Sequence, residues 1–144
     1  DEVVDRLVAE RILREDCAEG FVLDGYPRTV PQAEVVDNLL IRHKVEPVVV
    51  FLKVDYNIIV DRLTQRRQCP NCKTIYNLSQ NPPHLDGVCD NCGADLMVRE
   101  DDREDVVRGR LLAYERQTSP VLEFFRSSGY RVLEVDGSAG AQQM

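Results

Sequence analysis

The chain has 144 residues and a formal net charge of −7, with 30 % charged and 43 % hydrophobic residues. This composition is typical of one globular domain with room for a small inserted lobe. The negative charge argues against general attraction to nucleic acid or to an anionic membrane. No apolar run approaches the roughly 20 residues of a membrane span. We therefore expect a cytoplasmic protein with neither nucleic acid nor membrane as a partner.

The first third of the chain predicts helices alternating with strands. Apolar residues recur at helical spacing over Val4–Asp16, and because no cap precedes this helix we interpret the chain as a piece of a longer protein. The short apolar run Phe21–Leu23 is typical of a buried strand. A helix with a proline in its first turn is predicted over Thr29–Arg42. The β-branched run Val48–Leu52 has the pattern of a parallel strand buried on both faces.

The remaining elements continue this alternation around a lobe that is rich in turn residues. A helix capped by its first residue is predicted over Asp55–Gln65, and the lobe occupies roughly residues 68–98. Asp101 or Asp102 is predicted to cap the long helix that follows. Val132–Val135 is predicted to be the last strand. Strands that alternate with helices indicate an α/β domain with a parallel sheet, into which the lobe is inserted.

Two Cys-x₂-Cys pairs separated by sixteen residues are the strongest chemical signal: Cys69, Cys72, Cys89 and Cys92. Four thiolates at this spacing are a tetrahedral ligand set for Zn²⁺, and because no ligand position is left for water the metal would be structural. Arginines flank the pairs on both sides: Arg62, Arg66, Arg67, Arg99, Arg103, Arg108 and Arg110. We expect a metal-stapled lobe that closes on a ligand rich in phosphate. A ribbon that only holds a loop together, or two disulfides, are the alternatives.

A second signal is the segment that follows the first predicted strand, Asp24-Gly25-Tyr26-Pro27-Arg28-Thr29. Ligands of open α/β sheets bind at the carboxyl ends of the strands. A carboxylate there can hold a hydrated Mg²⁺, and an arginine four residues later can bind a phosphate with its planar fork. A simple turn with a solvated arginine is the alternative.

These motifs, taken in order, resemble the adenylate kinases of the long-lid bacterial type, in which four cysteines bind zinc. The segments that carry the resemblance are Gly20–Thr29, Val60–Leu63, Arg66-Arg67, Tyr76, Pro82-Pro83, the four cysteines, Arg99–Asp102, Arg108–Leu111 and Val135–Gly137. The resemblance implies the α/β parallel-sheet fold of the P-loop nucleoside monophosphate kinases, incomplete in this chain, with an inserted zinc-binding lid. Residues 1–65 and 103–144 would then be parts of the core, and residues 66–102 the lid.

The resemblance also implies a reaction and a set of site residues. A monomeric enzyme would transfer a phosphoryl group from ATP to AMP, giving two ADP, with Mg²⁺ bound to ATP. The implied AMP-binding residues are Gly25, Tyr26, Pro27, Arg28, Gln32, Arg99 and Arg110. The implied ATP-binding residues are Arg62, Arg66, Ile75, Tyr76 and Ser138. The implied catalytic residues are Arg28, Arg62, Arg66, Arg99, Arg110 and Asp24, with Asp24 ordering the water shell of Mg²⁺ and with Asp101 and Asp102 orienting the lid arginines.

The sequence departs from the family pattern at the phosphate loop. It contains no G-x-x-x-x-G-K-[ST] motif and no other glycine-rich loop followed by lysine. In the family, that loop and the first strand precede the helix with which this chain begins, and the strand lies between Phe21–Leu23 and Val48–Leu52. We therefore expect these 144 residues by themselves to be inactive and unstable, while the zinc lobe still folds. Asn77 and Gln80 occupy positions at which some relatives carry residues that pack near the ATP base.

Three other interpretations remain open: a kinase of another nucleoside monophosphate, a non-catalytic remnant or fragment, and a zinc-ribbon module that binds nucleic acid. The last requires basic residues with interleaved aromatic residues. Between Asp61 and Arg116, however, nine basic residues are balanced by ten acidic residues, and Tyr76 is the only aromatic residue before Tyr114. Cys17, outside the two pairs, is predicted to be a small buried residue.

Overall fold

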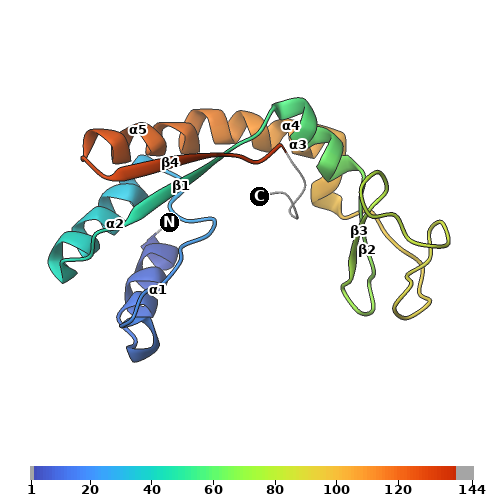
Figure 1. The fold of residues 1–144 in the computed structure, drawn as a ribbon, viewed down its shortest axis with the longest axis horizontal. Coiled ribbons are helices and arrows are strands. Elements are labelled where there is room, and N and C mark those ends of the chain that lie inside the picture. Colours follow the sequence, from blue (N-terminus) through green and yellow to red (C-terminus); the bar gives the residue numbers. More distant parts are fainter. Residues whose placement is uncertain (1, 139–144) are drawn as a thin grey trace. The chain divides into compact units, whose positions relative to one another are not determined.

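The computed structural model describes residues 2–138, which form two compact units (Figure 1). The described part of the first unit comprises residues 2–52 and 113–135, and that of the second comprises residues 53–112 and 136–138. The second unit contains the whole predicted lid together with helical segments on either side, so the predicted lid boundaries remain a prediction. None of the described helices is long and apolar enough to cross a lipid bilayer.

The elements of the first unit are α1 (Glu2–Ile12), a 3₁₀ turn (Glu15–Cys17), α2 (Val30–His43), β1 (Val48–Lys53), α5 (Ser119–Ser127) and β4 (Arg131–Asp136). The predicted helix start at Thr29 is confirmed, because the Thr29 hydroxyl accepts a hydrogen bond from the backbone N–H of Gln32 at 3.4 Å. The helix ends at His43, and the capping residue Lys44 adopts the left-handed conformation that follows many helices. The first helix ends at Ile12, four residues earlier than predicted.

Strands β1 and β4 pair with each other and run in the same direction (Figure 1). Val49 of β1 packs on the core of this unit, which is formed by Ala33 and Phe125 with Val121. The predicted burial of β1 on both faces is wrong, because Val48 and Val50 on the alternate face are 51 % and 57 % exposed. In a strand, successive side chains point to opposite faces, and no described element covers this second face.

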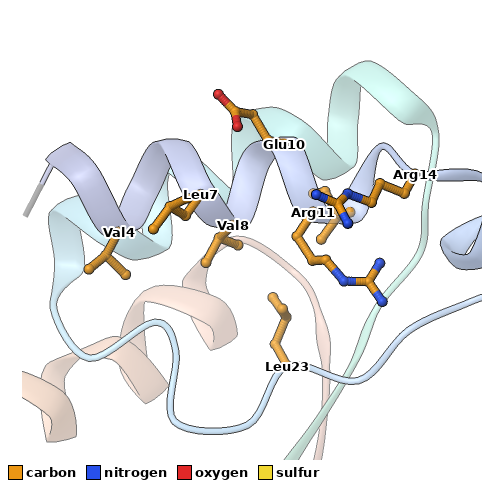
Figure 2. A pocket seen from close by; sticks show the side chains of 8 residues that line it. Val4, Leu7, Val8, Glu10, Arg11, Arg14 and Leu23 are labelled. Atoms are coloured by element: carbon orange, nitrogen blue, oxygen red, sulfur yellow. The ribbon is translucent and has the colours of Figure 1, made fainter.

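The prediction of a strand at Phe21–Leu23 is also wrong. The segment is extended but irregular, because no described strand pairs with it and a ladder needs a partner. The Val22 side chain is 91 % exposed. Leu23 instead lies beside α1, where it lines a shallow apolar groove with Val4, Leu7 and Val8 (Figure 2).

The elements of the second unit are α3 (Tyr56–Thr64), β2 (Arg66–Gln68), β3 (Ile75–Asn77), a 3₁₀ turn (Glu100–Asp102) and α4 (Glu104–Ala113). Asp55 caps α3 as predicted, by accepting a hydrogen bond from the backbone N–H of Asn57 at 2.8 Å. Strands β2 and β3 are antiparallel, and Gln68 also exchanges two backbone hydrogen bonds with Met97. The lobe therefore contains a short antiparallel ribbon, and its first and last segments are held together by the contacts between Gln68 and Met97.

The predicted cap of the long helix by Asp101 or Asp102 is wrong. Helix α4 begins at Glu104, and its first described backbone hydrogen bond runs from Val107 N–H to the Arg103 carbonyl. The two aspartates lie in the preceding 3₁₀ turn, where their carboxylates contact arginines instead. After α4 the chain continues through a π-helical segment (Tyr114–Thr118) into α5.

One polar contact joins α2 to Tyr130, which lies between α5 and β4 and packs on an aromatic residue of α5. The rings of Phe125 and Tyr130 meet edge to face, with their centroids 5.8 Å apart. The Tyr130 hydroxyl donates a hydrogen bond to the Asp37 carboxylate on α2, which raises the pKa of Tyr130 to about 12. This bond links residues that are far apart in the sequence and should stabilise the packing of α2 on α5.

Replacing Tyr130 by Phe should lower the free energy of unfolding by about 1 kcal/mol at neutral pH. The pKa of Tyr130 is raised in the folded chain, so this contribution is fully present below pH 10, the ordinary tyrosine value, and is lost as the pH rises through 12. Urea unfolding of both proteins at pH 7 and pH 9 should give the same difference. Tyr114→Phe, which changes a more exposed hydroxyl, is the matched control and should be nearly neutral. Equal stability of the Tyr130 variant and the parent would contradict the role of this bond.

Candidate functional site

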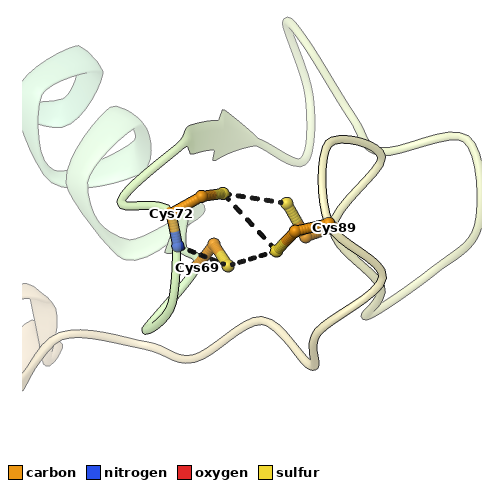
Figure 3. Close-up of side chains that lie close together, drawn as sticks. Cys69, Cys72 and Cys89 are labelled. Atoms are coloured by element: carbon orange, nitrogen blue, oxygen red, sulfur yellow. Dashed lines mark hydrogen bonds between the residues drawn. The ribbon is translucent and has the colours of Figure 1, made fainter.

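The four cysteines predicted to bind metal come together at the centre of the lobe. Their sulfur atoms lie within 4.8 Å of one another, and none is in a disulfide. The Sγ atoms of Cys69 and Cys92 are 3.4 Å apart, and those of Cys72 and Cys89 are 3.5 Å apart (Figure 3). Four thiolates at the usual zinc–sulfur distance have sulfur atoms about 3.8 Å apart, whereas a disulfide requires about 2 Å. The cluster therefore fits a tetrahedral metal and does not fit two disulfides.

The two cysteine pairs have the same backbone geometry. In each pair, the residue after the second cysteine donates its backbone N–H to the carbonyl of the first cysteine. Lys73 donates to Cys69 at 3.1 Å, and Gly93 donates to Cys89 at 2.8 Å. Both donors adopt positive φ angles, +63° at Lys73 and +71° at Gly93. This turn brings the two thiols of one pair to the same side, which is what a shared metal requires.

Neighbouring polar groups lower the pKa of two of these thiols. Hydrogen bonds from Thr74 lower the pKa of Cys72 to about 5. The hydroxyl of Tyr76, 3.5 Å from Cys89 Sγ, lowers the pKa of Cys89. Since metals bind the thiolate form, these contacts favour metal binding at neutral pH.

An ion pair closes the base of the lobe. Both guanidinium nitrogens that face Asp102 donate to its carboxylate, Arg66 Nε at 2.8 Å and Nη2 at 2.5 Å. The Asp102 side chain is fully buried and that of Arg66 is 24 % exposed. The pair is bidentate, the geometry in which arginine binds carboxylates most strongly, and it raises the pKa of Arg66. Asp102 thus holds Arg66 in one orientation, and its role in orienting a lid arginine stays a prediction.

The neighbouring Asp101 contacts two more of the predicted arginines, Arg99 and Arg110. Its carboxylate lies 3.3 Å from Arg99 Nη2, and its backbone carbonyl accepts a hydrogen bond from Arg110 Nη1 at 3.4 Å. Arg66, Arg99 and Arg110 are therefore gathered around one 3₁₀ turn, although they come from β2, the end of the lobe and α4. Three guanidinium groups in one place are suited to a ligand with several phosphate oxygens.

Arg62 and Ser138, both predicted to bind ATP, contact each other in the second unit. Arg62 on α3 donates to the backbone carbonyls of Gly137 at 2.7 Å and Ser138 at 2.5 Å. Ile75 and Tyr76 lie on β3, where Ile75 is 52 % exposed and Tyr76 only 5 % exposed. The Tyr76 hydroxyl accepts the backbone N–H of Asp90 and supports the cysteine cluster, so Ile75 is the one of the two that offers an apolar surface. Their contact with a nucleotide base stays a prediction.

The predicted AMP-binding residues from Gly25 to Arg28, with Gln32, form a tight loop in the first unit. Arg28 Nε donates to the Gly25 carbonyl at 2.7 Å, and Gly25 has a positive φ of +75° that disfavours any side chain there. The backbone N–H of Arg28 donates to Gln32 Oε1 at 2.9 Å, so the Gln32 amide braces the loop. Tyr26, which is followed by Pro27 in a cis peptide, donates its hydroxyl to Asp5 at 2.9 Å. The loop is thus held from two helices.

Asp24 stands apart from these contacts. It is exposed and makes no hydrogen bond or ion pair within residues 2–138. Its oxygen atoms are therefore available to a cation or its water ligands, and carboxylate oxygens are what Mg²⁺ prefers. Of the predicted AMP-binding residues, Gly25–Arg28 and Gln32 lie in the first unit. Arg99 and Arg110 lie in the second unit, together with the predicted ATP-binding residues.

Sequence analysis did not identify one residue that the structure places at this loop. The Thr118 hydroxyl donates to the backbone carbonyl of Arg28 at 2.9 Å, across 90 residues of sequence. Thr118 ends the π-helical segment, and such segments occur often at functional sites. No sequence signal marks it, because a threonine in a helical stretch next to Pro120 is predicted simply as a helix boundary.

Comparison with known proteins shows which family the chain resembles. The family model described as adenylate kinase matches residues 1–130. Adenylate kinases of Geobacillus sp. (strain WCH70), Thermosipho melanesiensis and Thermotoga maritima are 47 %, 45 % and 44 % identical over 90 %, 96 % and 97 % of the chain. The chain spans 61 %, 64 % and 64 % of the length of these relatives.

Helices packed on parallel strands, and a four-cysteine lobe inserted between them in the sequence, are consistent with the family match and place the chain in the α/β fold of the P-loop nucleoside monophosphate kinases. The chain belongs to the adenylate kinase family. The four cysteines could hold a metal in the lid.

Removing the buried carboxylate at the base of the lid should be costly. Asp102→Ala should lower the free energy of unfolding of this unit by about 3 kcal/mol, because Arg66 would keep a largely buried charge without its partner. Asp101→Ala is the matched control, since the Asp101–Arg99 pair is exposed and should contribute less than about 1 kcal/mol. Urea unfolding followed by circular dichroism measures both variants. Similar losses in the two would show that burial does not distinguish these pairs.

Proposed function

We propose that the protein carrying this chain is a nucleoside monophosphate kinase and, more narrowly, an adenylate kinase that converts ATP and AMP to two ADP. The observation that carries the proposal is the cluster of Arg66, Arg99 and Arg110 around the Asp101–Asp102 turn. The names of the relatives favour AMP as the acceptor. We further propose that it acts as a monomer in the cytoplasm.

The proposed chemistry depends on positioning and on charge. In phosphoryl transfer, negative charge spreads over the oxygens of the transferred group, so fixed positive groups stabilise the transition state and no side chain need act as a nucleophile. Arg66 and Arg62 would bind the ATP side, and Arg99 and Arg110 would bind phosphates shared with AMP. Because Asp102 and Asp101 already orient three of these four groups, little side-chain freedom would remain to be lost on binding.

The loop from Gly25 to Arg28 would bind AMP. Its backbone is braced by Gln32 and by Thr118, while the Arg28 side chain is exposed at the surface. Among residues 2–138, the guanidinium hydrogen-bonds only to the Gly25 carbonyl, through Nε, so its two terminal nitrogens remain available for a phosphate. Bound with ATP, Mg²⁺ would neutralise phosphate charge, and the exposed carboxylate of Asp24 would hold its water ligands.

We propose that the metal in the lid is Zn²⁺. A set of four thiolates that fits a tetrahedron is the ligand set that structural zinc takes in proteins. With all four positions occupied by sulfur, the metal would have no open site for substrate or water. Its role would be to hold the lid folded, so that the ends of the lid present their arginines correctly.

The chain should bind one zinc ion, and Cys89→Ser should abolish binding and lower the melting temperature by roughly 10 °C or more. The physical reason is that zinc binding free energy contributes directly to folding of the lid. Metal analysis of protein purified under reducing, zinc-replete conditions measures the stoichiometry, and Cys17→Ser, which changes a thiol outside the cluster, should retain the metal. Zinc-free parent protein with an unchanged melting temperature would refute the assignment.

Replacing Arg28, Arg66, Arg99 or Arg110 by Ala should each lower kcat/KM by roughly 100-fold or more, since each removes a charged donor to the transition state. The measurement is a coupled assay of ADP formation on the chain expressed with the sequence that flanks it in its gene. AMP should be preferred over CMP, UMP and GMP as acceptor. The 144 residues alone should be inactive, because they contain no glycine-rich phosphate loop.

The matched controls for these variants are Arg126→Ala and Arg131→Ala. Both residues are exposed, and Arg126 pairs with Glu123 and Glu134 on the surface. Their loss should change kcat/KM by less than about twofold. Equal losses in the two sets of arginines would mean that the cluster reflects surface charge and not a site.

A further inference from the structure

The side chain of Asn77 joins the lid to helix α3. Its amide nitrogen donates to the backbone carbonyl of Arg62 at 3.0 Å. Its amide oxygen accepts three hydrogen bonds from the turn that follows, two from Ser79 and one from the backbone N–H of Gln80, at 2.8–3.0 Å. One side chain therefore uses both ends of its amide, one toward the helix and one toward the turn.

The carbonyl that Asn77 contacts lies at the end of helix α3. The helix ends at Thr64, so Arg62 belongs to its last turn, where groups outside the helix can donate to the backbone carbonyls. The next groups along the chain are satisfied in the same way from outside the helix. Arg67 Nη1 donates to the Thr64 carbonyl, and Leu78 N–H donates to the Gln65 carbonyl at 3.1 Å. The end of α3 is therefore completed by the lid.

The turn itself is closed independently of this contact. Asn77 and Asn81 exchange two backbone hydrogen bonds, at 3.1 and 2.9 Å. An amide oxygen that accepts from residues two and three positions later is the usual Asx turn, and an aspartate can make it as well. Only the donor half of the Asn77 amide reaches Arg62, so the two halves can be separated by substitution.

Arg62 is the residue through which this contact would act. Its guanidinium holds the carbonyls of Gly137 and Ser138, while its own carbonyl is held by Asn77. The backbone of Arg62 is thus fixed from the lid side and its side chain from the segment after β4. A shift of the lid turn would pull on the same residue that is proposed to bind the ATP side.

We propose that Asn77 is a positioning residue that couples the lid to the ATP side of the site through the backbone carbonyl of Arg62. The inference rests on the proposed function for its effect on ATP. Asn77 does not touch the reacting atoms, and it acts by keeping Arg62 in place while the lid is folded. Its loss affects the binding of ATP and leaves the binding of AMP at Arg28 unchanged.

Three substitutions at Asn77 test the coupling. Asn77→Asp keeps the turn and removes the donor to Arg62, Asn77→Ser keeps a weaker turn without a charge and is too short to reach Arg62, and Asn77→Ala removes both halves. Each should raise the KM for ATP by roughly tenfold, the size expected for one lost hydrogen bond to a partly buried acceptor, with the KM for AMP changed by less than about twofold. Ser79→Ala, which weakens only the turn, is the control and should leave both KM values unchanged.

A second readout does not depend on catalysis. Amide hydrogen exchange should become faster at the Leu78 N–H, which bonds to Gln65, in all three Asn77 variants. In Asn77→Asp the N–H groups of Ser79 and Gln80 should remain protected as in the parent protein. All variants are made in the chain expressed with the sequence that flanks it in its gene. If that parent protein forms no ADP, the proposed function is wrong, and the exchange data together with direct ATP binding still decide whether the coupling exists.

Two results would overturn the proposal. The first is an Asn77→Asp protein with the ATP KM and the Leu78 exchange rate of the parent, since the donor would then be unnecessary. The second is an equal rise in the KM for ATP and for AMP, which would indicate general damage to the fold rather than coupling to Arg62.

Discussion

The bidentate ion pair between Arg66 and Asp102 is the constraint on which the lid depends. It joins two residues that are 36 positions apart, and the Asp102 carboxylate in it is fully buried while Arg66 is 24 % exposed. Two backbone hydrogen bonds between Gln68 and Met97 close the same base one step further in. Since both ends of a long loop are pinned, a local staple is enough to fold what lies between them.

That staple is the cluster of four cysteines, of which Cys69 and Cys89 form the core of the lobe with Tyr76. A lobe of this size cannot bury enough apolar surface to fold by itself, so metal ligation would replace a hydrophobic core. The ion pair and the cysteine cluster thus have separate roles. One determines where the lid begins and ends, and the other determines its internal structure.

The same few contacts also place the residues proposed to bind phosphate. Asp102 and Asp101 are adjacent in sequence, so the turn that closes the lid also carries the contacts to Arg99 and Arg110. On the other side of the lid, Asn77 links the ribbon to the end of α3. The contacts that orient the arginines are therefore the same contacts that hold the lid, so a substitution that disturbs the lid should also displace the arginines.

The sequence by itself determined those features that depend on local spacing: the cysteine pairs, the capped starts of α2 and α3, and the motif at Asp24–Thr29. Only the tertiary structure decided which groups meet across long separations. Asp102 was predicted to cap a helix and instead binds Arg66, because a buried carboxylate is stabilised more by a charged partner than by backbone N–H groups. Strand formation at Phe21–Leu23 failed for the same kind of reason, since an apolar run becomes a strand only when a neighbouring strand offers it hydrogen bonds.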